Sequence, residues 1–176
     1  MARGFTARAA VLAAALSVLG GCSVFEGSTV PCPTVGVLDN AGHLTRFRSG
    51  GSDLTDVEFR ANVGSLAAEC SFDGETRTGS IDLDIVFRTQ RGPASSATEQ
   101  NFDYFVAVVD PEGGVAARKA FSVQVAFEGS RTEAARAEPL VLDVPVKENA
   151  SFSAYRIYIG MELTKEQFER NLGGGR

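Results

Sequence analysis

The clearest pattern in the chain is an alternation over residues 81–88, which run Ile81-Asp82-Leu83-Asp84-Ile85-Val86-Phe87-Arg88. Successive side chains of a β-strand point to opposite faces of its sheet. Most of the apolar residues therefore share one face, and the two aspartates share the other face with the arginine. This pattern predicts a strand that is buried on one side. We expect Leu83 to point into a core between two sheets and Asp84 to point away from it.

The same period of two recurs along the chain. Residues 102–109 are apolar on both faces, which is typical of a strand in the middle of a sheet. Pro145 has no amide hydrogen to give to a ladder, so it places the end of one strand at a sheet edge. Further strands with alternating apolar positions are predicted over residues 57–63, 121–127, 140–146 and 155–161.

Turn residues separate these strands. Gly64 predicts a bulge or bend, after which the first strand continues to Phe72. Asp73-Gly74 predicts a hairpin, and residues 110–114 predict another turn. Residues 128–138 are polar and are expected to form a loop.

The C-terminal part breaks the period of two. Thr164-Lys165-Glu166-Gln167 matches a capping box, which predicts a helix that runs to about Leu172 and ends at the glycines after it. With seven to nine strands before it, the chain is expected to be all-β: an antiparallel, immunoglobulin-like β-sandwich with a short C-terminal helix. A closed barrel is the alternative.

The N-terminal segment has the features of a secretion signal. Arg3 and Arg8 precede an apolar run, residues 9–19, that is too short to span a bilayer comfortably. The run ends in Leu19-Gly20-Gly21-Cys22, which resembles the lipobox of bacterial lipoprotein precursors. The resemblance implies removal of residues 1–21 and acylation of Cys22. The alternative is an uncleaved membrane anchor without acylation.

These features divide the chain into four parts. We expect a signal peptide over 1–21, a lipidated tether over 22–31, the β-sandwich over 32–172 and a flexible tail over 173–176. By resemblance to lipoproteins of Gram-negative bacteria, Ser23 after the acylated cysteine favours delivery to the outer membrane. The domain is then expected to face the periplasm, held by its acyl chains.

The remaining cysteines form an even set once Cys22 carries lipid. Cys32 and Cys70 would then lie in a compartment that permits disulfides, and we expect them to be bridged. Two buried free thiols are the alternative.

The charge of the chain argues against a nucleic-acid-binding function. The chain carries a formal charge of −5, which becomes about −7 when Arg3 and Arg8 leave with the signal peptide. There is no run of basic residues, so a nucleic acid is not an expected partner. Arg88 and Arg91 flank a polar loop; they could meet a partner carboxylate or lipid headgroups, or pair with acids on the surface.

Catalytic and metal-binding groups are sparse. His43 is the only histidine, and the chain has no G-x-S-x-G motif, so we expect no enzyme activity, no cofactor and no metal. Asp82 and Asp84 could bind calcium or do acid–base work if Asp103 lay beside them on a paired strand. The other interpretation is a solvated strand face.

Several segments together resemble a family of uncharacterised lipoproteins from alphaproteobacteria. The resemblance spans nearly the whole mature chain, but the family has no known activity, so it implies no site residues. The segments are Cys32-Pro33, Asp53-Leu54-Thr55-Asp56-Val57, Cys70, Arg91-Gly92-Pro93-Ala94, Asp103-Tyr104-Phe105-Val106-Ala107-Val108 and Leu163-Thr164.

The sequence therefore predicts a non-enzymatic, lipid-anchored envelope protein. Its periplasmic β-sandwich is expected to serve envelope structure or contacts with a periplasmic protein. The alternative function is that of an accessory lipoprotein subunit of a trans-envelope secretion or export machine.

Overall fold

A computed structural model describes residues 30–173. The predicted signal peptide, Cys22 with its predicted acylation, and residues 174–176 lie outside this range. Eight strands, two 3-10 turns and one α-helix follow one another within it: β1 (Thr34–Val37), β2 (His43–Phe47), η1 (Leu54–Asp56), β3 (Val57–Asp73), β4 (Thr78–Arg91), β5 (Glu99–Val109), β6 (Val115–Ala126), β7 (Glu133–Pro145), η2 (Phe152–Ala154), β8 (Arg156–Met161) and α1 (Lys165–Leu172).

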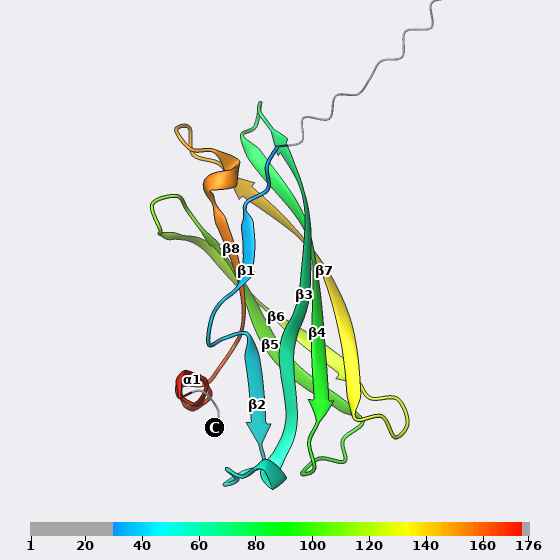
Figure 1. Cartoon of the computed structure of the whole chain (residues 1–176). Helices are drawn as coiled ribbons and strands as arrows, with labels where there is room; N and C mark the ends of the chain where they lie inside the picture. Colours follow the sequence, from blue (N-terminus) through cyan, green and yellow to red (C-terminus); the bar gives the residue numbers. More distant parts are fainter. Residues whose placement is uncertain (1–29, 174–176) are drawn as a thin grey trace, which may run out of the picture.

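The strands form two four-stranded sheets that pack face to face (Figure 1). One sheet has the order β1-β8-β5-β6, and the other has the order β2-β3-β4-β7. The predicted all-β sandwich is thus confirmed, and the described strands do not close into a barrel. Every pairing is antiparallel except that of β1, which runs parallel to β8.

The core lies between the inner faces of the two sheets. Leu83 is 1% exposed, and its apolar neighbours on the same face of β4 are equally buried, whereas Asp84 is exposed. Phe87 packs against two aromatic rings of the other sheet, with ring centroids 5.3 Å from Phe102 and 4.8 Å from Tyr104. The faces predicted from residues 81–88 are therefore confirmed.

Gly64 lies at a break in the pairing of β3 with β4. The register shifts between Val63 and Ser65, so the inward positions change from odd to even residue numbers. The apolar residues before and after the break therefore reach the same core, as the predicted bulge requires. β3 runs without interruption for 17 residues, and the Asp73 carboxylate accepts hydrogen bonds from two amides of the turn that follows.

β5 lies between β8 and β6, as its two apolar faces predict. Its outward-facing Phe105 is covered by Arg118, whose guanidinium lies 4.2 Å from the ring centroid. Gly160 of the neighbouring strand leaves room for the ring, because a Cβ there would lie 2.6 Å from the Phe105 Cζ.

β7 is the edge strand of its sheet, as Pro145 predicts. It contains a second proline, Pro139, which an edge strand tolerates because one side of its ladder is free.

The prediction of a loop over residues 128–138 is wrong for its second half, since β7 already begins at Glu133. Pairing with β4 over Ile85–Gln90 holds this polar segment extended, although its composition favours a loop.

Tyr155 closes the corner between β7 and β8. The buried ring lies just before β8, and its hydroxyl accepts a hydrogen bond from the Lys147 amide at 3.1 Å and donates to the Pro145 carbonyl at 3.4 Å. A tyrosine that bonds back to the backbone at this corner is a mark of immunoglobulin-type sandwiches. The order β3-β4-β7 opposite β8-β5-β6 fits the same scheme, with β1 in the place of a final strand beside β8.

The predicted disulfide between Cys32 and Cys70 is present, with its Cα atoms 5.5 Å apart. It joins the segment before β1, in one sheet, to β3 in the other. Val30 also packs against the core, so the start of the described chain is held at this end of the molecule. Closing a loop of this size restricts the unfolded chain and is worth about 4 kcal/mol on the chain-entropy model.

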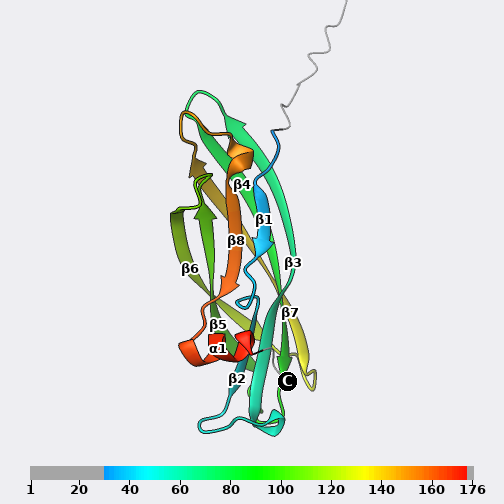
Figure 2. The same ribbon diagram turned by 60° about the vertical axis from the view of Figure 1, so that its left-hand side comes forward.

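The predicted helix is confirmed as α1. Thr164 caps it by accepting a hydrogen bond from the Gln167 amide at 3.2 Å, and Gln167 accepts one from the Thr164 amide in return. Figure 2 shows α1 beside β2. Asn171 donates hydrogen bonds to the carbonyls of Asn40 and His43, which fastens the helix to the fold.

No helix within residues 30–173 has the length and apolar character needed to cross a membrane.

We predict that Tyr155→Phe lowers the free energy of unfolding by about 1–3 kcal/mol, because the Lys147 amide loses a partly buried partner. Urea unfolding followed by circular dichroism measures this loss. Tyr158→Phe is the matched control, since the Tyr158 hydroxyl makes no hydrogen bond within residues 30–173, and it should change stability by less than about 0.5 kcal/mol. Equal effects of the two changes would contradict the assigned corner.

Candidate functional site

Polar side chains gather on the outer face of the second sheet, near η1. Arg60 and Asn62 of β3 lie opposite Gln90 and Arg88 of β4, respectively. All four side chains are exposed and belong to positions that alternate with the buried core residues. The period of the strands therefore places two arginines and two amides on one surface.

An open groove of about 500 Å³ runs over this surface. Arg131, from the loop before β7, and Glu133, at the start of β7, complete its polar lining. We call this surface the arginine groove and define it by Arg60, Asn62, Arg88, Gln90, Arg131 and Glu133.

The arginines of the groove have spare hydrogen-bonding capacity. Within residues 30–173, the guanidinium groups of Arg60 and Arg88 make no ion pair and no hydrogen bond. Arg131 approaches Glu128 only at 3.9 Å, with both side chains exposed, so this pair contributes little. Three cationic groups and one carboxylate thus line a groove on a chain whose formal charge is −5.

The bulge in β3 helps to position Arg88. The Arg88 side chain lies over Gly64, where an added Cβ would come within 2.9 Å of the Arg88 Nε. The glycine therefore serves two purposes, since it carries the register shift and leaves space for a groove arginine.

A second, smaller hollow adjoins the arginine groove. It has a volume of about 230 Å³ and shares Arg60 and Gln90 with the groove. Leu54 of η1, which is 73% exposed, lines it together with Val57 and Pro93. We call it the Leu54 hollow. Its apolar side chains lie directly beside the cationic ones.

The loop that forms one wall of the Leu54 hollow is tied to the start of β3. The Gly92 amide donates to the Glu58 carbonyl at 2.7 Å, and the Ala94 amide donates to the Val57 carbonyl at 3.0 Å. A Cβ at position 92 would lie 2.1 Å from the Val57 oxygen, so this close approach requires glycine.

Asp56 organises the turn that carries Leu54. Its carboxylate accepts hydrogen bonds from the amides of Ser52 and Asp53, at 3.1 and 3.3 Å, and pairs with Arg48. These amide hydrogen bonds, with the Arg48 guanidinium, lower the pKa of Asp56 below its ordinary value.

Arg88 and Arg91, the two arginines that flank the polar loop after β4, have different roles. Arg88 lines the groove, whereas Arg91 donates to the carbonyls of Ala97 and Arg131 and lies over the Phe127 ring. The Arg91 amide also donates to Thr132 at 2.7 Å. Arg91 therefore holds the loop that carries Arg131 and does not itself face the groove.

The aspartates considered for calcium do not come together. Asp82 and Asp84 lie on the outer face of β4, and Asp103 lies in the other sheet, where it accepts a hydrogen bond from Ser122. The assumption that these strands pair is wrong, because β4 pairs with β3 and β7. Among residues 30–173 no group of three or more His, Cys, Asp or Glu side chains is arranged to hold a metal ion.

The remaining predicted residues lie elsewhere. His43 is exposed at the start of β2, and its carbonyl accepts a hydrogen bond from Asn171. Cys32 and Cys70 are bridged near the β3–β4 turn, far along β3 from the groove. Cys22 lies outside the described residues.

Sequence reasoning missed Arg60, Asn62 and Arg131 as members of one surface. The alternation of residues 57–63 does assign Arg60 and Asn62 to the outward face of their strand. Their meeting with Arg88 depends on the register of β3 against β4, and Arg131 is brought in by a loop.

No protein-family model, no curated protein and no solved structure matches this chain. The chemistry of the groove is therefore inferred from its own residues.

We predict that Asp56 stabilises the fold in a pH-dependent way. Because the pKa of Asp56 is lowered on folding, its contribution is present above about pH 4 and is lost as the pH falls through the folded-state pKa. Asp56→Asn should therefore lower the Tm at neutral pH, and the difference from the wild type should shrink on acidification. Differential scanning calorimetry at several pH values measures both Tm values.

Asp39→Asn is the control for this prediction, since the Asp39 carboxylate is exposed and accepts no hydrogen bond within residues 30–173. It should leave the Tm nearly unchanged across the same range. A Tm difference for Asp56→Asn that stays constant from neutral to acidic pH would rule out the proposed role of the ionised carboxylate.

Proposed function

We propose that this chain is a non-enzymatic, lipid-anchored envelope protein whose β-sandwich faces the periplasm and binds a partner protein. The observation that carries the proposal is that the start of the domain and the arginine groove lie near opposite ends of one elongated sandwich. An anchor at one end would present the groove at the other.

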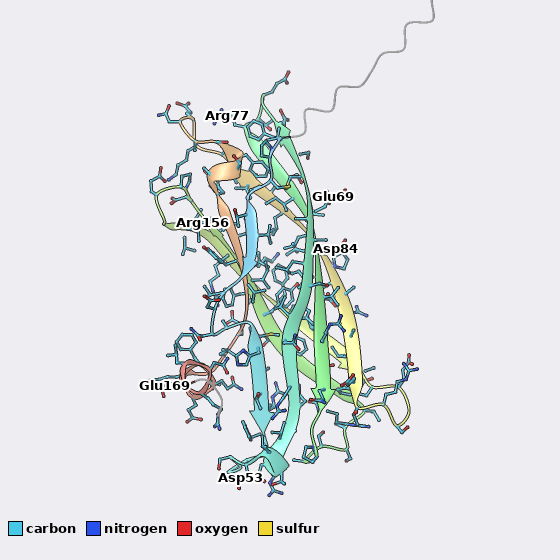
Figure 3. The ribbon with its side chains drawn as sticks, viewed as in Figure 1. Asp53, Glu69, Arg77, Asp84, Arg156 and Glu169 are labelled. Carbon is cyan, nitrogen blue, oxygen red and sulfur yellow. A yellow bond between two sulfur atoms is a disulfide. The ribbon has the colours of Figure 1, made fainter. Side chains whose placement is uncertain are left out.

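The separation of the two ends follows from the length of β3. Cys70 marks the end where the chain enters the domain, and Arg60 lies ten residues earlier on the same strand. At about 3.3 Å per residue, this distance is roughly 30 Å. In Figure 3, Arg77 marks the first end and Asp53, which precedes η1, marks the second.

The rigidity of the link supports the same proposal. The Cys32–Cys70 bridge fixes the entering chain to β3, and β3 continues as one strand to the groove. A tether attached to this end would therefore leave the groove at the far end of the sandwich. Acylation at Cys22 would supply the membrane attachment, and more than one acyl chain makes such attachment stable.

The groove has the character of a contact surface. It is open, lies mainly on regular strands, and combines free guanidinium groups with the exposed apolar Leu54 beside them. Arginine is enriched where proteins bind each other. This combination favours a protein partner as the function of the domain.

We predict that Cys22→Ala loses its lipid mass and is no longer anchored by acyl chains, because Cys22 is the only residue with the lipobox context. Intact-protein mass spectrometry and membrane fractionation measure the two effects. Ser28→Ala, in the same predicted tether, should keep the lipid and the membrane location. The same lipid mass on Cys22→Ala would refute the anchor.

We also expect a groove-dependent partner in the envelope. Affinity purification from detergent-solubilised envelope, with mass spectrometry, should recover a protein with the wild type that is lost with Arg60→Ala combined with Arg88→Ala. The matched control is Asp82→Asn with Asp84→Asn, on the same sheet face. Subunits of an export machine among the lost proteins would assign the accessory-subunit role. Recovery of the same proteins with every variant would overturn the proposed contact surface.

A further inference from the structure

We infer that the arginine groove and the Leu54 hollow together bind an extended acidic peptide segment of a partner protein. Two carboxylates of the segment would meet Arg60 and Arg88, and an apolar side chain next to them would lie on Leu54. This inference rests on the proposed function and names the chemistry of the partner.

The spacing of the two arginines fits carboxylates at alternate positions of an extended chain. Because Arg60 lies opposite Gln90 and Asn62 lies opposite Arg88, the two arginines are diagonal neighbours on adjacent strands. The Cα atoms of such neighbours are roughly 7 Å apart, and the Cα atoms of residues two apart on an extended peptide have nearly the same separation. Each guanidinium can then bind one carboxylate in a bidentate manner.

The Leu54 hollow favours a peptide over other anions. Leu54 is 73% exposed, and the hollow that it lines with Val57 and Pro93 shares Arg60 with the groove. A phosphate group or a lipid headgroup has no apolar side chain to place there. A peptide can offer a carboxylate and an aliphatic side chain within a few residues, and burying the aliphatic group adds to the affinity.

Two amides in the groove suit a peptide backbone. Gln90 makes no side-chain hydrogen bond within residues 30–173, and it borders both the groove and the hollow. Asn62 donates one amide hydrogen to the Val63 carbonyl at 3.2 Å and makes no other side-chain hydrogen bond in the described part of the chain. Both side chains can donate to peptide carbonyls and accept from peptide amides.

The charges around the groove restrict where an acidic segment binds. Glu69, Asp82 and Asp84 occupy the same sheet face toward the disulfide end, and Glu69 and Asp84 lie closer to Arg77 than to Asp53 in Figure 3. These carboxylates repel an acidic segment, and Glu133 does the same at the margin of the groove. The ligand is thereby confined to Arg60, Arg88 and Arg131.

The test is the binding of a fluorescein-labelled peptide, Gly-Leu-Ser-Asp-Thr-Asp-Gly, to the full-length protein in detergent, followed by fluorescence anisotropy. We expect saturable binding that weakens with added salt. Arg60→Ala and Arg88→Ala should each raise the Kd about tenfold, as the loss of one charge-assisted contact implies. Leu54→Ser should raise the Kd while leaving its salt dependence unchanged, since it removes an apolar contact.

The controls separate this inference from its alternatives. Asp82→Asn and Asp84→Asn should bind at least as tightly as the wild type, and a peptide with Asn in place of both Asp residues should not bind. Unaltered binding in Arg60→Ala combined with Arg88→Ala would overturn the inference. A second result would also overturn the inference: these arginines bind inorganic phosphate or phosphatidylglycerol vesicles, and the protein does not bind the peptide. The site would then be one for phosphate or lipid.

The same experiment distinguishes this inference from the proposed membrane anchor. Cys22→Ala should bind the peptide with the wild-type Kd, because Cys22 is no part of the groove. Peptide binding with no lipid on the wild-type chain would refute the anchor alone. A lipidated, membrane-bound chain that binds no peptide would refute the acidic ligand alone.

Discussion

The pairing of β4 on both of its sides is the constraint on which the rest of the structure depends. β4 bonds to β3 over Thr78–Arg91 and to β7 over Thr78–Gln90, while its apolar face is buried against the opposite sheet. A shift by one residue would turn that face to the solvent and its aspartates to the core, so the register is fixed by burial. The faces that β3 and β7 turn outward follow from this register.

The groove is a consequence of the same register. With β4 in place, Arg88 stands beside Asn62 and diagonal to Arg60, and the bulge at Gly64 leaves space for the Arg88 side chain. Arg91, at the end of β4, bonds to the carbonyls of the loop that brings Arg131 to the groove. The core and the proposed binding surface therefore lie on the inner and outer faces of the same two strands, β3 and β4. The disulfide holds the other end of β3 to the entering chain.

Local patterns predicted much of the fold, and long-range pairing explains what they missed. The alternation of residues 81–88, the bulge at Gly64 and the helix cap at Thr164 depend on near neighbours and were confirmed. The strand over Glu133–Glu138 has a polar sequence and forms only because β4 pairs with it. The parallel place of β1 and the meeting of Arg60 with Arg88 likewise depend on contacts between distant segments, which a single sequence does not encode as a local signal.

Native-state hydrogen exchange measured residue by residue by NMR tests the central role of β4 most directly. Amides of β4 that bond to β3 and β7 should be among the slowest to exchange and should open only with global unfolding, whereas those of α1 and of β1 should exchange through smaller openings. If the β4 amides instead exchanged as fast as those of α1, β4 would not be the doubly paired strand at the centre of its sheet, and the account built on its register would be contradicted.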